Sequence, residues 1–233
     1  MQFSGRGVLL DIEGTTSAVA YVYDVMFPFA RRAIPTYVAD HWSDDAMRDV
    51  RRQFAQDAGR EFDSPSALAD EAHRLMDSDV KATGLKTLQG LVWEAGFRSG
   101  ELQAHVYDDV PPALERWRAA GLDLRVYSSG SVHAQRLFFG HTEAGDLTPH
   151  FSGHYDTTTG PKRDAESYRR IAEDWRLPPG EILFLSDVTE ELNAARAAGM
   201  ATCLVVRPGN AEASAAQPPH VRVGSFGELA LRV

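Results

Sequence analysis

Short runs of consecutive apolar residues recur along the chain, and several of them end at a polar residue that is followed by a glycine or by a stretch of helix formers. Apolar runs that do not alternate with polar residues are typical of parallel strands covered on both faces. The pattern predicts four such strands and a weaker fifth: 7–11, 122–128, 181–187 and 202–207, with 154–158 as the weaker one.

Stretches with helical character lie between the later strands, at 110–121, 164–176 and 189–199. The first of them has two prolines near its start and Gly121 at its end, which is the usual punctuation of a helix. Strands that alternate with helices indicate βαβ units, so the sequence predicts a doubly wound α/β fold with a parallel sheet.

The stretch 17–105 interrupts this alternation because it is rich in helix formers and carries no convincing strand. We therefore expect an α/β core formed by residues 1–16 and 106–233. A helical cap, residues 17–105, is expected as an insertion after the first strand. The segment 209–219 reads as a surface loop.

Composition narrows the class of protein. The 233 residues are 43% hydrophobic and 24% charged, which is ordinary for a globular protein, and the net charge is −9. This charge argues against nucleic acid or an anionic membrane as a partner. A single cysteine, Cys203, rules out an internal disulfide. We find no signal peptide or membrane-spanning run, so we expect a cytoplasmic protein.

Polar side chains stand at or just beyond the carboxyl ends of the predicted strands: Asp11, Ser128 with Ser129, Lys162 and Asp187. Each alone is open to an ordinary interpretation as a helix cap, a turn former or a surface lysine. Together they occupy the edge at which open α/β sheets bind ligands. Two carboxylates suit Mg²⁺, and a lysine with hydroxyls beside a glycine suits a phosphate.

The order Asp-x-acid-Gly-Thr, then Ser, Lys and Asp resembles the haloacid dehalogenase superfamily of phosphotransferases. The first motif there is usually Asp-x-Asp, whereas "DIEGTT" places Glu13 second. This variant, with "YSSGSVHAQ", "DTTTGPK", "LFLSDVTEE" and "VVRPGNA", is similar to the enolase-phosphatases, the acireductone synthases of methionine salvage. The similarity extends from residue 7 to about residue 210. Pro161 departs from it, because a polar residue is expected before the lysine.

The resemblance implies a role for each motif residue. Asp11 would be the nucleophile that forms an aspartyl phosphate. Glu13 would protonate the leaving oxygen and later activate water, and it would also serve the enolisation step. Glu191 would steady a metal-bound water. The implied Mg²⁺ ligands are Asp11, the Glu13 backbone carbonyl and Asp187, and the implied phosphate ligands are Ser128, Ser129 and Lys162.

The implied substrate is 2,3-diketo-5-methylthiopentyl 1-phosphate, a small phosphorylated diketone. Its products would be phosphate and the acireductone 1,2-dihydroxy-3-keto-5-methylthiopentene. The methylthio tail would lie against the cap, where Tyr21, Tyr23, Met26 and Phe27 are candidates, although such a stripe is more typical of a helix core. We expect a monomer that contacts neither nucleic acid nor membrane.

Four alternatives remain at this point. A haloacid dehalogenase-family phosphatase of another small phosphorylated metabolite shares the whole core. A phospho-acceptor signalling domain has similar parts in a different order, and a dehalogenase has no need of Asp187. A binding protein without catalytic activity is disfavoured by the complete set of motif residues. A phosphatase assay with and without EDTA distinguishes it from the enzymes.

Overall fold

The computed structural model describes residues 1–80, 82–210 and 220–233, and the chain forms two compact units. Unit 1 comprises Met1–Tyr21 and Gln103–Val233, and unit 2 comprises Val22–Leu102. The insertion was expected at 17–105, a few residues wider at each end. Most of the expected loop 209–219 lies outside the described residues.

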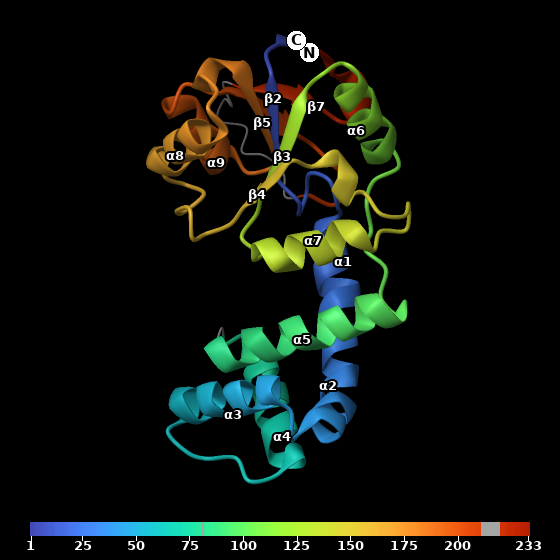
Figure 1. Ribbon diagram of the computed structural model, residues 1–233, viewed down its shortest axis with the longest axis vertical. Coiled ribbons are helices and arrows are strands. Elements are labelled where there is room, and N and C mark those ends of the chain that lie inside the picture. Colours follow the sequence, from blue (N-terminus) through green and yellow to red (C-terminus); the bar gives the residue numbers. More distant parts are fainter. Residues whose placement is uncertain (81, 211–219) are drawn as a thin grey trace. The chain divides into compact units, whose positions relative to one another are not determined.

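Unit 1 is built on a six-stranded parallel sheet with the strand order β4-β3-β2-β5-β6-β7 (Figure 1). This confirms the predicted doubly wound α/β class. The order changes direction around β2, and such a switch point is where ligands bind in open sheets. The strands are β2 (Gly7–Leu10), β3 (Asp123–Tyr127), β4 (Gly153–Tyr155), β5 (Ile182–Ser186), β6 (Ala201–Val205) and β7 (Val221–Val223).

The central strands are buried on both faces. Val8, Leu9 and Leu10 of β2 have no exposed surface, and all five residues of β5 are buried. Helices α8 (Ala165–Trp175) and α9 (Thr189–Ala197) lie on one side of the sheet, and α6 (Val110–Ala119) lies on the other (Figure 1). Apolar burial of this kind is the main term that stabilises the sheet.

Three short strands were not predicted from the sequence. β1 (Gln2–Ser4) pairs in parallel with β8 (Ala230–Arg232) as a separate two-stranded sheet, and β7 extends the edge of the main sheet. Each has three residues and carries exposed side chains, so no apolar run marks it. These segments form strands because they pair with distant parts of the chain, and the local sequence gives no sign of that pairing.

Helix ends in unit 1 follow local capping rules. The Ser131 hydroxyl accepts the Ala134 N–H at the start of α7 (Val132–Gly140), and Asp164 caps α8 through the Glu166 N–H. Such caps each contribute about 1 kcal/mol. Both helices begin directly after polar loops that follow β3 and β4, so the caps fix where those loops end.

A short helix, α1 (Val19–Tyr21), ends the first segment of unit 1. Unit 2 is helical in its described part and begins with a π-helical turn (Val22–Met26), which four longer helices follow: α2 (Phe27–His41), α3 (Asp45–Ala58), α4 (Pro65–Asp77) and α5 (Thr83–Ser99). α3 packs on α5, and α2 packs on α4 and α5. Fully buried Ile34, Met47, Leu68 and Leu88 contribute one side chain from each long helix to its core. None of the helices in the described ranges is long and apolar enough to cross a membrane.

Candidate active site

Three neighbouring strands place the motif residues at one edge of the sheet. Leu10 of β2 lies in register with Val126 of β3 and with Leu185 of β5. The residues that follow these strands, Asp11, Ser128 and Asp187, therefore emerge side by side. Lys162 reaches the same edge from the loop between β4 and α8.

Asp11 is the centre of this cluster and is only 2% exposed. Its Oδ1 lies 2.6 Å from the Lys162 Nζ and accepts the Ile12 N–H at 2.8 Å. Its Oδ2 accepts a hydrogen bond from the Ser186 hydroxyl at 3.1 Å. These contacts fix both carboxylate oxygens, and Lys162 places a positive charge directly beside them.

Lys162 is shared between two carboxylates, because its Nζ also lies 2.7 Å from Glu191 Oε2. Burial disfavours the ammonium, but Asp11 and Glu191 outweigh it and raise the pKa of Lys162. Burial and the Asp11 charge raise the pKa of Glu191 to about 7 despite the opposing lysine. Glu191 therefore contacts the lysine directly, and its expected role beside a metal-bound water stays a prediction.

The backbone around Lys162 is held by three hydroxyl groups. Tyr127 donates to the Gly160 carbonyl at 2.8 Å, Ser167 to the Pro161 carbonyl at 2.8 Å, and Tyr168 to the Lys162 carbonyl at 2.7 Å. A Cβ at Gly160 would lie 2.2 Å from the Ser167 hydroxyl, so only glycine fits there. Pro161 donates no N–H in any case, and its carbonyl still serves as an acceptor.

Glu13 points its carboxylate toward the turn after β3, where Ser128 Oγ donates to Glu13 Oε2 at 3.4 Å. Burial and the Asp11 charge raise the pKa of Glu13. A carboxyl group whose protonated form is favoured by its surroundings suits general acid–base work. Glu13 is thereby distinguished from Asp11, which is paired with the lysine.

Asp187 approaches the turn after β2 closely. Gly14 has a φ of +71°, and a Cβ there would lie 2.1 Å from Asp187 Oδ2. Both the backbone conformation and the lack of space therefore require glycine. Burial and the charges of Asp11 and Glu13 raise the pKa of Asp187 to about 7. This edge of the sheet therefore carries more carboxyl groups than cations, because only Lys162, of the cationic residues that the structure describes, lies among Asp11, Glu13, Asp187 and Glu191.

That donor set fits a hard divalent cation. Two carboxylates, Asp11 and Asp187, and backbone oxygens of the following turn are the ligand types that Mg²⁺ prefers, with waters completing its shell. The described part of the chain contains no cluster of three or more His, Cys, Asp or Glu side chains arranged to hold a metal. A site with two carboxylates and one carbonyl does not need such a cluster.

The two serines of the phosphate motif differ in their surroundings. Ser128 is buried, and its Oγ also accepts the Gly130 N–H at 3.2 Å. Ser129 is exposed. The structure therefore brings together Asp11, Glu13, Ser128, Lys162 and Asp187, while Ser129 stands on the surface of the same turn.

The sequence interpretation did not assign a role to Arg207, which supports the loop behind Asp11. Arg207 Nε donates to the Thr15 carbonyl at 3.0 Å, and Nη1 lies 2.9 Å from both Asp109 oxygens. Asn210 Nδ2 donates to the Gly14 carbonyl at 2.8 Å. "VVRPGNA" begins in a predicted strand, so the strand-end rule applied to the other motifs could have indicated this residue.

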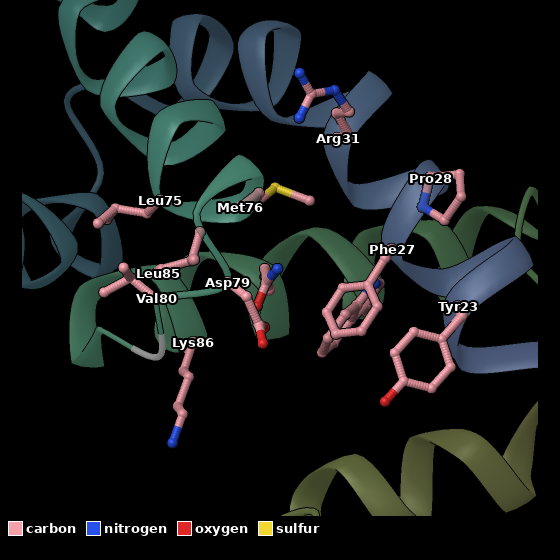
Figure 2. A pocket seen from close by; sticks show the side chains of 12 residues that line it. Tyr23, Phe27, Pro28, Arg31, Leu75, Met76, Asp79, Val80, Leu85 and Lys86 are labelled. Carbon is pink, nitrogen blue, oxygen red and sulfur yellow. The ribbon is translucent and has the colours of Figure 1, made fainter. Parts of the chain in front are cut away.

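Unit 2 carries a pocket of about 560 Å³ of its own (Figure 2). Tyr23, Phe27 and Trp93 form its aromatic wall, and the Trp93 indole N–H donates to the Met26 carbonyl at 2.9 Å. Other lining residues include Pro28, Leu75, Met76, Val80 and Leu85, with Arg31, Asp79, Lys86 and Gln89 as polar members.

The expected tail contacts divide between the two units. Tyr23, 65% exposed, and Phe27 line the pocket. Met26 contributes the carbonyl that the Trp93 indole contacts. Tyr21 belongs to unit 1, where it is buried and donates to the Gln103 carbonyl at 2.7 Å.

Comparisons with known proteins agree on a family. The family model of the haloacid dehalogenase-like hydrolases matches residues 6–199. An "Enolase-phosphatase E1" of Pseudomonas syringae is 51% identical over 88% of this chain and 91% of its own. One of Pseudomonas aeruginosa is 48% identical over 96% and 97%. The crystal structure of the UTR4 protein of Saccharomyces cerevisiae has a TM-score of 0.82 and 34% identity, covering 97% of this chain and 100% of that one.

Proposed function

The chain belongs to the enolase-phosphatases of the haloacid dehalogenase-like hydrolases, and from this premise we propose how its residues act. The proposed reaction converts 2,3-diketo-5-methylthiopentyl 1-phosphate to the acireductone 1,2-dihydroxy-3-keto-5-methylthiopentene and phosphate, a step of methionine salvage. The observation that carries the assignment is the Asp11–Lys162 pair at 2.6 Å, with Glu13 and Asp187 beside it at the carboxyl edge of the sheet.

In the phosphatase half of the reaction, an Asp11 oxygen attacks phosphorus while the bond from phosphorus to the ester oxygen breaks. The Glu13 carboxyl gives its proton to the departing oxygen, and Lys162 offsets repulsion between the phosphate and the Asp11 carboxylate. Because phosphoryl transfer depends mainly on positioning and charge neutralisation, the fixed Asp11 oxygens and the short Lys162 contact favour it.

Water then releases phosphate from the aspartyl phosphate. Glu13, now a carboxylate, takes a proton from the water as its oxygen bonds to phosphorus, and the bond from phosphorus to Asp11 breaks. Asp11 returns as a carboxylate and Glu13 as an acid. The raised pKa of Glu13 favours this exchange of roles within one turnover.

Enolisation precedes phosphate release in the proposed scheme. Glu13 first releases to solvent the proton that it held at the end of the previous turnover, and as a carboxylate it removes a proton from the carbon that bears the phosphate ester. The electron pair of the broken C–H bond forms the C=C bond of the enol, and the adjacent carbonyl oxygen takes up the charge and then a proton from solvent. The same side chain then holds a proton next to the ester oxygen on that carbon. One carboxyl group thus serves both steps because the two reacting atoms are bonded to each other.

We propose Mg²⁺ as the cofactor, in line with the general magnesium dependence of the family. Asp11, the Glu13 carbonyl and Asp187 would hold it, and when bound it supplies charge neutralisation at the phosphate. The excess of carboxylates at the sheet edge supports this assignment.

Unit 2 is proposed to act as the cap that selects the substrate. Its pocket joins an aromatic wall to a methionine and polar residues, a lining suited to an apolar group on a polar small molecule (Figure 2). We also propose a cytoplasmic monomer, since every motif residue of the site comes from one chain and the single cysteine is buried.

The decisive experiment offers the purified protein the diketone phosphate with Mg²⁺ and follows enol absorbance and phosphate release together. We expect both signals, and we expect EDTA to remove phosphate release and added Mg²⁺ to restore it. Full phosphate release by EDTA-treated protein would contradict the metal assignment.

The second candidate function is hydrolysis of another small phosphorylated metabolite, because unit 1 would serve either reaction. A panel of sugar phosphates and phosphoglycolate discriminates the two. A kcat/KM for the diketone phosphate no greater than for the panel would favour this alternative.

A further inference from the structure

A buried glutamine binds the backbone of the turn Ser128–Gly130, which carries the proposed phosphate ligands. Gln135 lies in α7 and is 1% exposed. Its Nε2 donates to the Gly130 carbonyl at 2.8 Å and to the Tyr155 carbonyl at 2.7 Å. The Tyr155 carbonyl also accepts the Ser128 N–H at 3.3 Å, so one side chain links both ends of the turn.

The orientation of the Gln135 amide follows from its neighbours. Two carbonyl oxygens face Nε2, and because carbonyl oxygens only accept hydrogen bonds, the NH₂ group must be on that side. Oε1 is then left facing His154 Nδ1 at 3.1 Å. An amide oxygen accepts, so His154 carries its proton on Nδ1 and donates to Gln135.

His154 is suited to this task. It lies in β4, next to Tyr155, and burial together with Arg136 lowers the pKa of His154 to about 4. Its ring is therefore neutral near pH 7 and carries a single N–H, which the contact with Gln135 places on Nδ1. If Gln135 reversed its amide, two carbonyl oxygens would face its oxygen, and His154 would face its NH₂ group.

A second side chain holds the start of α7, two residues beyond the turn. Asp156 Oδ2 accepts the Val132 N–H at 3.0 Å, and Oδ1 accepts the Thr158 N–H and hydroxyl at 2.9 and 2.6 Å. Gln135 thus attaches the turn to β4, and Asp156 attaches the start of α7 to the loop that leads to Lys162. The two parts of the proposed phosphate site are coupled through these contacts.

We propose that Gln135, oriented by His154, is a positioning residue that holds the Ser128–Gly130 turn in the geometry that binds the substrate phosphate. This rests on the proposed function of that turn. Gly130 is fixed through its carbonyl, and because a trans peptide directs its C=O and N–H to opposite sides, the Ser131 N–H of that peptide is fixed as well. Small displacements of such donors weaken an anion site.

The test uses Gln135→Glu, which keeps the size of the side chain but replaces the NH₂ group with a carboxyl oxygen. That oxygen would face two carbonyl oxygens, so the turn should move away. We expect the Kd for inorganic phosphate, measured by ³¹P NMR titration in MgCl₂, to rise ~10-fold, the effect of losing a buried hydrogen-bonded group. The KM for the phosphorylated substrate should rise in parallel.

The matched control is Trp175→Phe. It removes a partly buried hydrogen bond of 2.7 Å, from the indole N–H to Asp123, in the same unit but outside the site. We expect it to lower the melting temperature without changing the Kd for phosphate. An equal rise in Kd for the two variants would show that loss of stability, and not positioning, is responsible.

His154→Phe tests the orienting contact. In the wild-type background it should raise the Kd for phosphate by ~3-fold. In a protein that already carries Gln135→Met it should not change that Kd further, because His154 acts only through Gln135. If Gln135→Glu does not fold, Gln135→Met and His154→Phe provide the same comparison.

The outcomes separate this inference from the function on which it rests. An inactive wild-type protein overturns the proposed function. An active wild type whose folded Gln135 variants bind phosphate with unchanged Kd overturns the role of Gln135 alone. Independent, additive effects of Gln135→Met and His154→Phe overturn the orienting contact.

Discussion

Asp11 and Glu13 are two residues apart, yet their surroundings differ, which supports the different roles proposed for them. Asp11 has Lys162 at 2.6 Å and accepts two further hydrogen bonds. The Glu13 carboxylate accepts a hydrogen bond from the Ser128 hydroxyl at 3.4 Å, and burial together with the Asp11 charge raises the pKa of Glu13. When two neighbouring carboxyl groups have different environments, one can act as the nucleophile and the other as the general acid and base.

Asp11→Asn tests the nucleophile. An amide is a poor nucleophile, so we expect phosphate release to fall by ~10³-fold or more. Circular dichroism and a thermal melt should show an intact fold, because the amide has the same shape and relieves repulsion with Asp187. Substantial turnover by a variant free of wild-type contamination would rule out the covalent intermediate.

Glu13→Gln tests whether one carboxyl group serves both steps. The variant keeps the backbone carbonyl and the size of the side chain but loses proton transfer. We expect enol formation and phosphate release each to fall by ~10²–10⁴-fold, the usual contribution of general acid–base catalysis. Ultraviolet absorbance reports the enol and a phosphate assay the second step. Normal enol formation with blocked phosphate release would assign the enolisation base to another residue.

At the scale of elements, the segment after β6 supports the loop after β2. Arg207 is buried and pairs with Asp109, and its guanidinium lies 4.3 Å from the centre of the Tyr107 ring. Burial works to raise the pKa of Asp109, but hydrogen bonds from Arg207, Phe226 and Ser225 keep it below its usual range. The Asp109 carboxylate is therefore well paired, and Arg207 Nε fixes the Thr15 carbonyl.

Arg207→Met should destabilise unit 1 and loosen the turn behind Asp11. Removing one partner of a buried pair typically costs ~3–5 kcal/mol of unfolding free energy. Urea unfolding measures this, and calorimetry should show weaker Mg²⁺ binding. Arg6→Met, which breaks the exposed pair with Glu181, is the control and should cost no more than ~1 kcal/mol. Equal losses in the two variants would contradict the supporting role of Arg207.

At the scale of the whole molecule, the chain leaves unit 1 at Tyr21 and returns to it at Gln103. Unit 2 has its own hydrophobic core and its own pocket, while the catalytic candidates all belong to unit 1. Catalysis and substrate selection are thus proposed to be separable along the chain.

Exchanging Val22–Leu102 for the corresponding unit of another family member should change substrate preference. We expect kcat/KM for the diketone phosphate to fall ~10-fold or more, the usual scale of discrimination by an apolar pocket, with hydrolysis of a simple substrate such as p-nitrophenyl phosphate largely kept. A chimaera that retains the diketone preference would place specificity in unit 1. Circular dichroism of the chimaera is the folding control.

The sequence by itself determined the α/β class, the central strands and the chemical types at the strand ends. Buried parallel strands must be continuously apolar, and their carboxyl ends must share one edge, so Asp11, Ser128 and Asp187 could be grouped from their positions in the sequence alone. The short strands β1, β7 and β8 could not be predicted, because exposed three-residue strands carry no local signal.

Only the tertiary structure decided which side chains meet. Glu191 pairs with Lys162, Gln135 spans from Gly130 to Tyr155, and Arg207 reaches Thr15 across 192 positions of the chain. Each of these contacts depends on strand order, helix crossover and side-chain rotamer together. Periodicity and capping report only neighbours a few residues apart, so the groups that orient the site follow from the packing of distant segments.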